Sequence, residues 1–105
     1  MRGLTTVKVI TVRPWKIWLE VRGTANPSVS IVSNTTRGIR AVMEELEKRG
    51  LRPERVYLDA NMRMRAVYRV SPGMVPLIES LARRALEEAR RAASRRRVLF
   101  EYSVG

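Results

Sequence analysis

The 105-residue sequence has no cysteine, no histidine and no glutamine, and Asp59 is its only aspartate. The missing cysteine and histidine exclude disulfides, thiolate nucleophiles and the usual zinc ligands. Glu44, Glu45 and Glu47 fall on one expected helix, but no matching metal ligand or base stands elsewhere. The sequence also has neither a glycine-rich phosphate loop nor a Ser/His/Asp set. We therefore expect a protein that is not an enzyme and that holds no metal or cofactor.

Long apolar runs are also missing. No stretch approaches the roughly 18 apolar residues of a membrane span, and the first residues lack the apolar segment of a secretory signal. We expect a protein of the cytoplasm or the nucleoid that has no membrane partner. The scarcity of thermolabile residue types points to a thermophilic source.

Positive charge is what the sequence has in excess. Its 21 basic residues, 18 Arg and 3 Lys, face 10 acidic ones, giving a net charge of +11 and a pI of about 11.5. Such an imbalance repels itself in a compact state, and a polyanionic partner relieves that repulsion. The Arg excess favours oriented, bidentate contacts with phosphate, although a GC-rich genome or a hot habitat would also raise the Arg:Lys ratio. With 45% hydrophobic residues, the chain is expected to form one nucleic-acid-binding domain over residues 1–105.

The first half of the sequence predicts strands. Apolar and polar residues alternate over 7–21, which is the period of a strand. Pro14 interrupts this run, and the pattern leaves open whether it kinks one strand or joins two. A loop is expected over 23–27, followed by a short extended segment over 29–31.

A helix is expected next. Its apolar residues recur at the spacing i, i+3, i+4, i+7, one of three polar residues caps its start, and Gly50 ends it in a left-handed cap. The stripe consists of Ile39, Val42, Met43 and Leu46, and the candidate caps are Asn34, Thr35 and Thr36.

The second half predicts a hairpin, a helix and a last strand. Strands over 55–59, with Val56 and Leu58 facing the core, and over 62–70 flank a turn. The second helix is expected to start at Ser71-Pro72, or later near Pro76. Its stripe is Val75, Ile78, Ala82, Ala85, Ala89 and Ala92, and the last strand holds Val98, Phe100 and Tyr102. This order predicts an α+β two-layer sandwich with a ferredoxin-like arrangement of strands and helices and an extended N-terminal strand region.

Three arginines fall on one side of the strand over 62–70, opposite an apolar side. Alternation sorts the residues of the other strands onto the same open face of the sheet. Basic groups beside aromatic side chains are how single-stranded or looped RNA is bound. The binding candidates on this face are Lys16, Trp18, Arg22, Arg55, Tyr57, Arg63, Arg65 and Arg69, and the remaining residues of the face are Glu20, Asp59, Val67, Leu99, Glu101 and Ser103.

Two alternatives stay open for this face. The arginine row could pair across strands with Glu20, Asp59 and Glu101 as an ordinary charge lattice. Trp18 could pack under a loop or against a partner protein instead of stacking on a base.

A second basic cluster follows the alanine stripe of the second helix. The pairs Glu79–Arg83 and Glu87–Arg91 have favourable i, i+4 spacing, so part of this cluster is expected to be a solvated helix face. Arginines at the end of a helix are also favoured by the helix dipole. The cluster is a second candidate phosphate site and consists of Arg83, Arg84, Arg90, Arg91, Arg95, Arg96 and Arg97.

Two segments, over 65–71 with the helix through Leu86 and over 97–105, resemble the small ferredoxin-like protein subunits of archaeal ribonuclease P. The first reads Arg-Ala-Val-Tyr-Arg-Val-Ser and the second Arg-Val-Leu-Phe-Glu-Tyr-Ser-Val-Gly. The resemblance implies a non-catalytic subunit of a tRNA-processing ribonucleoprotein, which helps a catalytic RNA to fold and pairs with another protein subunit.

The expected function is therefore RNA binding as part of a ribonucleoprotein. The first alternative is a structural DNA-binding nucleoid protein, either monomeric or a homodimer. It ranks below RNA binding because no protruding helix or ribbon for the major groove is expected. A protein-interaction subunit that docks an acidic partner is the second.

Overall fold

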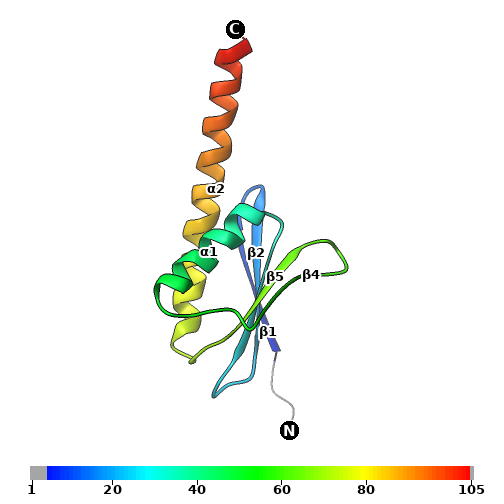
Figure 1. The fold of residues 1–105 in the computed structure, drawn as a ribbon, viewed down its shortest axis with the longest axis vertical. Coiled ribbons are helices and arrows are strands. Elements are labelled where there is room, and N and C mark those ends of the chain that lie inside the picture. The colour runs from blue at the N-terminus through cyan, green and yellow to red at the C-terminus, as the bar shows by residue number, and fades with distance from the viewer. Residues whose placement is uncertain (1–4, 105) are drawn as a thin grey trace.

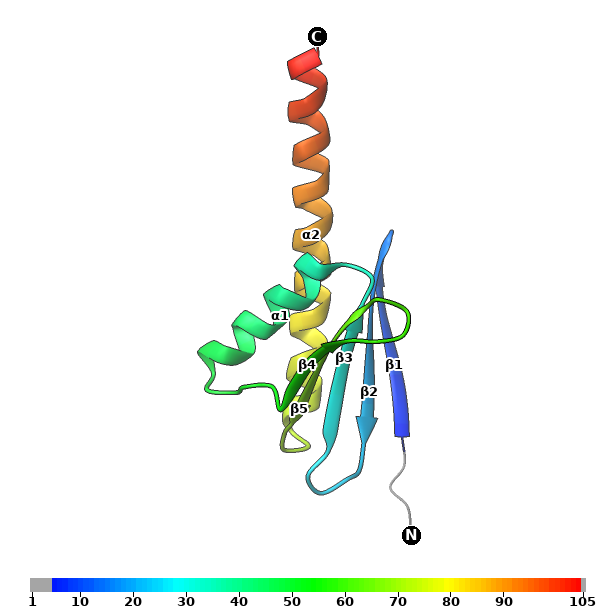
Figure 2. The ribbon, with the colours of Figure 1, turned by 45° about the vertical axis from the view of Figure 1, so that its right-hand side comes forward.

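The computed structural model describes the backbone of residues 5–104 and the side chains of residues 5–95. Five antiparallel strands form one sheet in the order β1-β2-β3-β5-β4, and two helices pack on one of its faces (Figures 1 and 2). The expected α+β two-layer arrangement is confirmed. In chain order the elements are β1 (Thr5–Val12), β2 (Trp15–Arg22), β3 (Ser28–Ser33), α1 (Thr36–Lys48), β4 (Arg55–Leu58), β5 (Met64–Arg69) and α2 (Met74–Val104).

The ferredoxin-like order is not found, because the C-terminal strand is absent from the described chain. The residues expected to form it, Val98 to Tyr102, continue α2 as helix. The fold does contain a split β-α-β unit, as a ferredoxin-like fold would. The unit consists of β3, α1 and β4, and β5 lies between its two strands in the sheet. The place beside β3 that a last strand would take is filled by β2, which pairs with β3 from Ile17 to Arg22.

The N-terminal region is two strands, which resolves the question that Pro14 left open. β1 and β2 form a hairpin with a turn at Arg13-Pro14, and they pair along their whole length, from Thr5 opposite Arg22 to Val12 opposite Trp15. Asn34 ties this turn to the start of α1, since its Oδ1 accepts a hydrogen bond of 2.9 Å from the Lys16 backbone N–H.

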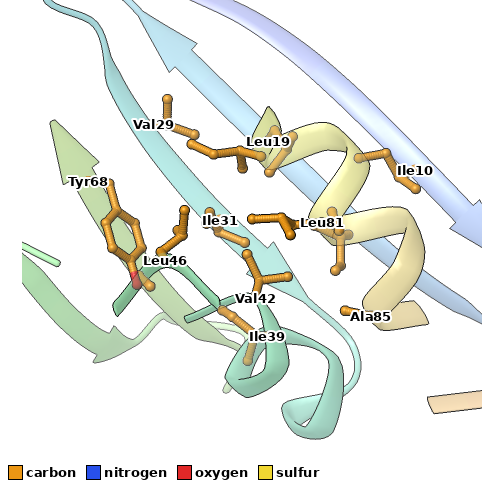
Figure 3. Close-up of a cluster of buried hydrophobic side chains, with 14 of the residues drawn as sticks. Ile10, Leu19, Val29, Ile31, Ile39, Val42, Leu46, Tyr68, Leu81 and Ala85 are labelled. Carbon is orange, nitrogen blue, oxygen red and sulfur yellow. The ribbon is translucent and has the colours of Figure 1, made fainter. Parts of the chain in front are cut away.

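The core lies between the sheet and the helices, as Figure 3 shows. Alternation along β2 and β3 sends one side of each strand inward, and the stripe of each helix meets it. Fully buried side chains from all the packed elements include Ile17, Leu19, Val29, Ile31, Ile39, Val42, Leu46, Tyr68, Ile78 and Leu86.

Helix α1 begins and ends as its sequence predicts. Thr35 is the N-cap, and its hydroxyl accepts a hydrogen bond of 3.4 Å from the Gly38 N–H. Gly50 ends the helix with a φ of 81°, and the Leu51 N–H donates back to the Leu46 carbonyl. Gly38 also permits close packing on α2, because a Cβ there would lie 3.3 Å from a Leu86 methyl group.

Helix α2 begins at Met74 rather than at Ser71-Pro72. The Met74 N–H donates to the Ser71 carbonyl and the Val75 N–H to the Pro72 carbonyl, so these residues form turns before the helix. The helix has 31 residues, about 46 Å at 1.5 Å per residue. Its C-terminal half projects beyond the sheet, which the sequence analysis did not anticipate (Figures 1 and 2).

The sheet is wider than the helix layer that covers it. Val56 and Leu58 point to the helix side, in register with Ala66 and Met64, but they are 45% and 59% exposed. The expectation that they face the core is wrong, because α1 packs on β3 and β5 and stops short of β4.

Candidate nucleic-acid interface

The face of the sheet opposite the helices, here called the open face, arranges its residues in rows across the strands. One row runs Trp18, Val32, Arg65 and Tyr57. The next row runs Glu20, Ser30, Val67 and Arg55, and the third runs Arg22, Ser28 and Arg69. The alternation in the sequence therefore placed the strand residues on the correct face.

Arg63 differs from Arg65 and Arg69, because it precedes β5 and belongs to the turn after Asp59. Met62 in the same turn has a φ of 62° and is exposed, not part of an apolar strand side. The Arg63 guanidinium lies over the Trp18 ring, 4.7 Å from its centroid. Arg63, rather than the indole beneath it, is the group of this pair placed to meet a ligand.

Arg65 is held by two carboxylates. Its Nε donates to Oδ2 of Asp59 at 2.9 Å, and its Nη1 donates to Oε2 of Glu20 at 3.1 Å. To reach Glu20 the side chain crosses β3, and Val32 in that row is buried. The charge lattice that the sequence left open is therefore present at Arg65, whose side chain is 23% exposed.

Asp59 organises the turn between β4 and β5. The hydrogen bond from Arg65 lowers its pKa below the ordinary value, and the backbone N–H groups of Arg63 and Asn61 lower it further. Those two N–H groups donate to Oδ1 at 3.0 and 2.8 Å. The same contact, together with the nearby charge of Glu20, raises the pKa of Arg65. Asp59 is thus a structural residue of the open face.

The remaining aromatic and arginine candidates form a looser group. The Arg55 guanidinium lies 5.3 Å from the centroid of the Tyr57 ring. Arg69 donates to the Asn26 carbonyl at 3.2 Å and approaches Glu54 at 3.5 Å, with about half of its side chain exposed. An exposed ion pair of this length is worth little, so Arg69 remains available to an anion.

Four cations of the open face form no ion pair within the described part of the chain: Lys16, Arg22, Arg55 and Arg63. Lys16 and Arg22 lie near the two ends of β2, about 20 Å apart at 3.3 Å per residue. They bracket the Trp18–Arg63 pair between them. This spread is suited to an extended anion and not to a single phosphate.

Val7 and Val9, which were not among the residues predicted for this face, extend the open face onto β1. They stand opposite Glu20 and Trp18 and are 55% and 51% exposed. The alternation of β1 carried this signal, but without a known partner strand its two sides could not be assigned. The open face is thus apolar along its β1 edge and basic towards β4 and β5.

The arginines of α2 lie away from the open face, on the helix layer. The expected pairs Glu79–Arg83 and Glu87–Arg91 are wrong, because Glu79 binds Lys8 at 2.6 Å and Arg91 binds Glu88 at 2.8 Å. Arg90 and Arg91 line a groove of about 530 Å³ with Arg13, which the sequence analysis did not select. Arg83 and Arg84 line a neighbouring groove with Glu79 and Glu87.

The end of the basic cluster is only partly described. Arg95 is exposed on α2, while the side chains of Arg96, Arg97, Leu99, Glu101 and Ser103 lie outside the described residues. The backbone of all of them is helical up to Ser103, so Leu99, Glu101 and Ser103 are not strand residues of the open face. The dipole argument is also wrong for 95–97, because the helix continues to Val104.

The chain matches no protein-family model, no curated protein and no solved structure. Neither described helix combines the length and the apolar character needed to cross a bilayer. Among the described residues, no three acidic side chains are grouped so that they would hold a metal ion.

Proposed function

We propose that the chain is a non-catalytic RNA-binding protein that holds single-stranded or looped RNA on the open face. The observation that carries the proposal is the Arg63–Trp18 pair, 4.7 Å from guanidinium to ring centroid, with cations on both sides of it that form no ion pair among the residues the structure describes. A guanidinium plane offers a base a stacking surface and a phosphate a set of donors. Arg22, Arg55 and Arg69 extend the same surface.

The roles of the candidates divide by their existing contacts. Lys16, Arg22, Arg55 and Arg63 are the phosphate ligands, because binding an anion would cost them no internal ion pair. Arg65 is a positioning residue, since replacing its two carboxylates by phosphate would leave Asp59 and Glu20 unpaired beside the anion. Tyr57 supports Arg55 as Trp18 supports Arg63.

The wider biological role belongs to the same proposal. We place the protein in the cytoplasm as a subunit of a ribonucleoprotein, and the resemblance to archaeal ribonuclease P subunits makes a tRNA-processing complex, from a thermophilic archaeon, the first to consider. The fold supports this less than the sequence did, since one of the two resembling segments is helix and not strand.

A DNA-binding nucleoid protein is the second candidate, and one observation favours it. The projecting half of α2 is an element of the kind that enters a major groove, and Arg90, Arg91 and Arg95 are exposed on its described part. The open face gives no comparable reason to prefer duplex DNA.

The experiment that tests the proposal is a binding titration of the purified chain at two salt concentrations. Structured RNA, single-stranded RNA and random duplex DNA of matched length are compared. A salt-sensitive preference for RNA is expected. Equal affinity for duplex DNA would favour the nucleoid protein, and weak, salt-independent binding to all three would contradict both and turn the search to acidic protein partners.

A further inference from the structure

Strand β1 leaves one edge of the sheet open. All its residues except Lys8 are β-branched, and it contains no proline or glycine. Within the described residues, its backbone pairs with β2 on one side only. Natural proteins protect long edge strands with charges, prolines or bulges because such edges pair with other strands. Lys8 gives little protection here, since its Nζ is turned to Glu79 on α2.

The surface beside the middle of this edge has no excess charge, although the chain as a whole carries +11 and the groove beside Thr11 and Val12 is basic. A groove of about 500 Å³ between β1 and α2 is lined by two glutamates and two arginines, with Ile10, Pro76 and Ser80. The charged residues are Glu79, Arg83, Arg84 and Glu87. Because a two-fold interface brings the same surface of both copies together, glutamates of this set in one copy can pair with arginines of the set in the other.

We propose that β1 pairs antiparallel with β1 of a second copy of this chain, with Val9 opposite Val9 on the two-fold axis. The partner is a second copy and not a foreign strand, because the two glutamates and two arginines of the groove can pair with the same four residues of another copy. The dimer has one continuous ten-stranded sheet, twice the five strands of the chain.

The register follows from the pleat and from Lys8. Residues opposite each other in an antiparallel pair point to the same face, so a two-fold axis must pass through a residue and not between two. An axis at Lys8 would set two ammonium groups face to face, which is unfavourable. An axis at Val9 avoids this, pairs Thr6 with Val12 and Val7 with Thr11, and covers the exposed valines. A two-fold axis at a residue nearer either end of β1 would pair fewer residues of the strand.

This register joins the two open faces. Val9 stands opposite Trp18 within each chain, so the row Trp18–Val9 of one copy continues into Val9–Trp18 of the other. The two Trp18–Arg63 pairs then lie about 14 Å apart, three strand spacings of 4.8 Å. The dimer therefore presents two basic surfaces with an apolar seam between them. The pairing itself does not depend on RNA binding.

The register is tested with a disulfide, which the absence of native cysteine makes simple. Antiparallel neighbours are within the Cα distance that a disulfide requires, so Val9→Cys is expected to cross-link spontaneously into a dimer under mild oxidation. Val7→Cys is the matched control, because Val7 faces Thr11 of the other copy. Cross-linking of Val7→Cys and not of Val9→Cys would overturn the proposed register.

The dimer is tested by sedimentation of the full chain without RNA. We expect a concentration-dependent dimer, and we expect Val9→Lys to weaken it at least about tenfold by setting like charges opposite each other. Val56→Lys, an exposed valine on the opposite edge strand, is expected to leave the dimer intact. Circular dichroism verifies that both variants fold. A monomer at every concentration, or equal weakening by the two variants, would contradict the proposal, and neither result would bear on RNA binding.

Discussion

Arg65 and Asp59 form a hydrogen-bonded ion pair of 2.9 Å at the mouth of the β4–β5 turn. The arginine at the centre of the basic row is therefore occupied within the protein itself. Asp59 also accepts hydrogen bonds from two backbone N–H groups of the turn. The guanidinium of Arg65 donates in addition to a second carboxylate, that of Glu20. On the open face, Arg65 is thus paired within the protein, while neighbouring cations form no ion pair among the described residues.

The Arg65–Asp59 ion pair predicts how stability depends on pH. Because the folded-state pKa of Asp59 lies below the ordinary 3.8, its contribution is complete above about pH 4 and is lost as pH falls through the folded pKa. Asp59→Asn is expected to lower the melting temperature at neutral pH, and the difference from the native protein should shrink as pH falls through the folded-state pKa of Asp59. Thermal unfolding followed by circular dichroism measures this, and a difference that stays constant with pH would show that charge is not the cause.

The Arg63–Trp18 pair predicts a change in indole accessibility. The chain has two tryptophans, so the measurement uses a Trp15→Phe background in which Trp18 alone fluoresces. Arg63→Ala is expected to increase quenching by the neutral quencher acrylamide and to cost about 0.5–1 kcal/mol of stability. Arg22→Ala, an exposed arginine of the same face without an aromatic contact, is the control. Equal quenching in the two variants would mean that Arg63 does not cover the ring.

Tyr68 predicts a stabilising substitution. Its hydroxyl is buried without a hydrogen-bond partner among the described residues, and burial raises its pKa to about 12. Tyr68→Phe removes the unpaired group and should raise the free energy of unfolding by up to about 1–3 kcal/mol. The gain in stability should grow above about pH 10, because there the tyrosine of the unfolded wild-type chain loses its phenolic proton while that of the folded chain keeps it. Urea unfolding at two pH values tests this, and a loss of stability would reveal a partner for the hydroxyl.

Part of the fold follows from local sequence signals. Helix α1 carries its own cap at Thr35 and its own stop at Gly50, and both act where the sequence places them. The faces of β2 and β5 follow from alternation, because the core-facing residues are apolar and most of the residues between them are polar or charged. These features depend on neighbours that are close in sequence.

The C-terminal strand was predicted wrongly although a local signal was present, whereas features that depend on distant partners could not be predicted. The apolar alternation of Val98, Phe100 and Tyr102 resembles a strand, yet it continues a helix with no glycine or proline between Leu77 and Val104. That missing stop signal was available in the sequence. Nothing local, however, pairs Arg65 with Glu20, 45 positions away, since this pair depends on β3 lying between β2 and β5. Nothing local leaves Val56 uncovered either, since its exposure depends on how far the helices extend over the sheet.

The most direct test of the central claim is a charge reversal on the open face with a matched one on the helix layer. Arg22→Glu/Arg55→Glu changes two exposed arginines of the open face, and Arg37→Glu/Arg40→Glu changes two on α1 by the same net charge. If Lys16, Arg22, Arg55 and Arg63 each bind a phosphate of single-stranded RNA, log affinity falls with log salt at a slope of about −2.8.

The open-face variant is expected to bind single-stranded RNA much more weakly, with a slope of about −1.4 because two phosphate contacts are lost. The α1 variant should keep the native slope and most of the affinity. Equal losses in the two variants would mean that net charge alone attracts the RNA, and the open face would then not be its binding site.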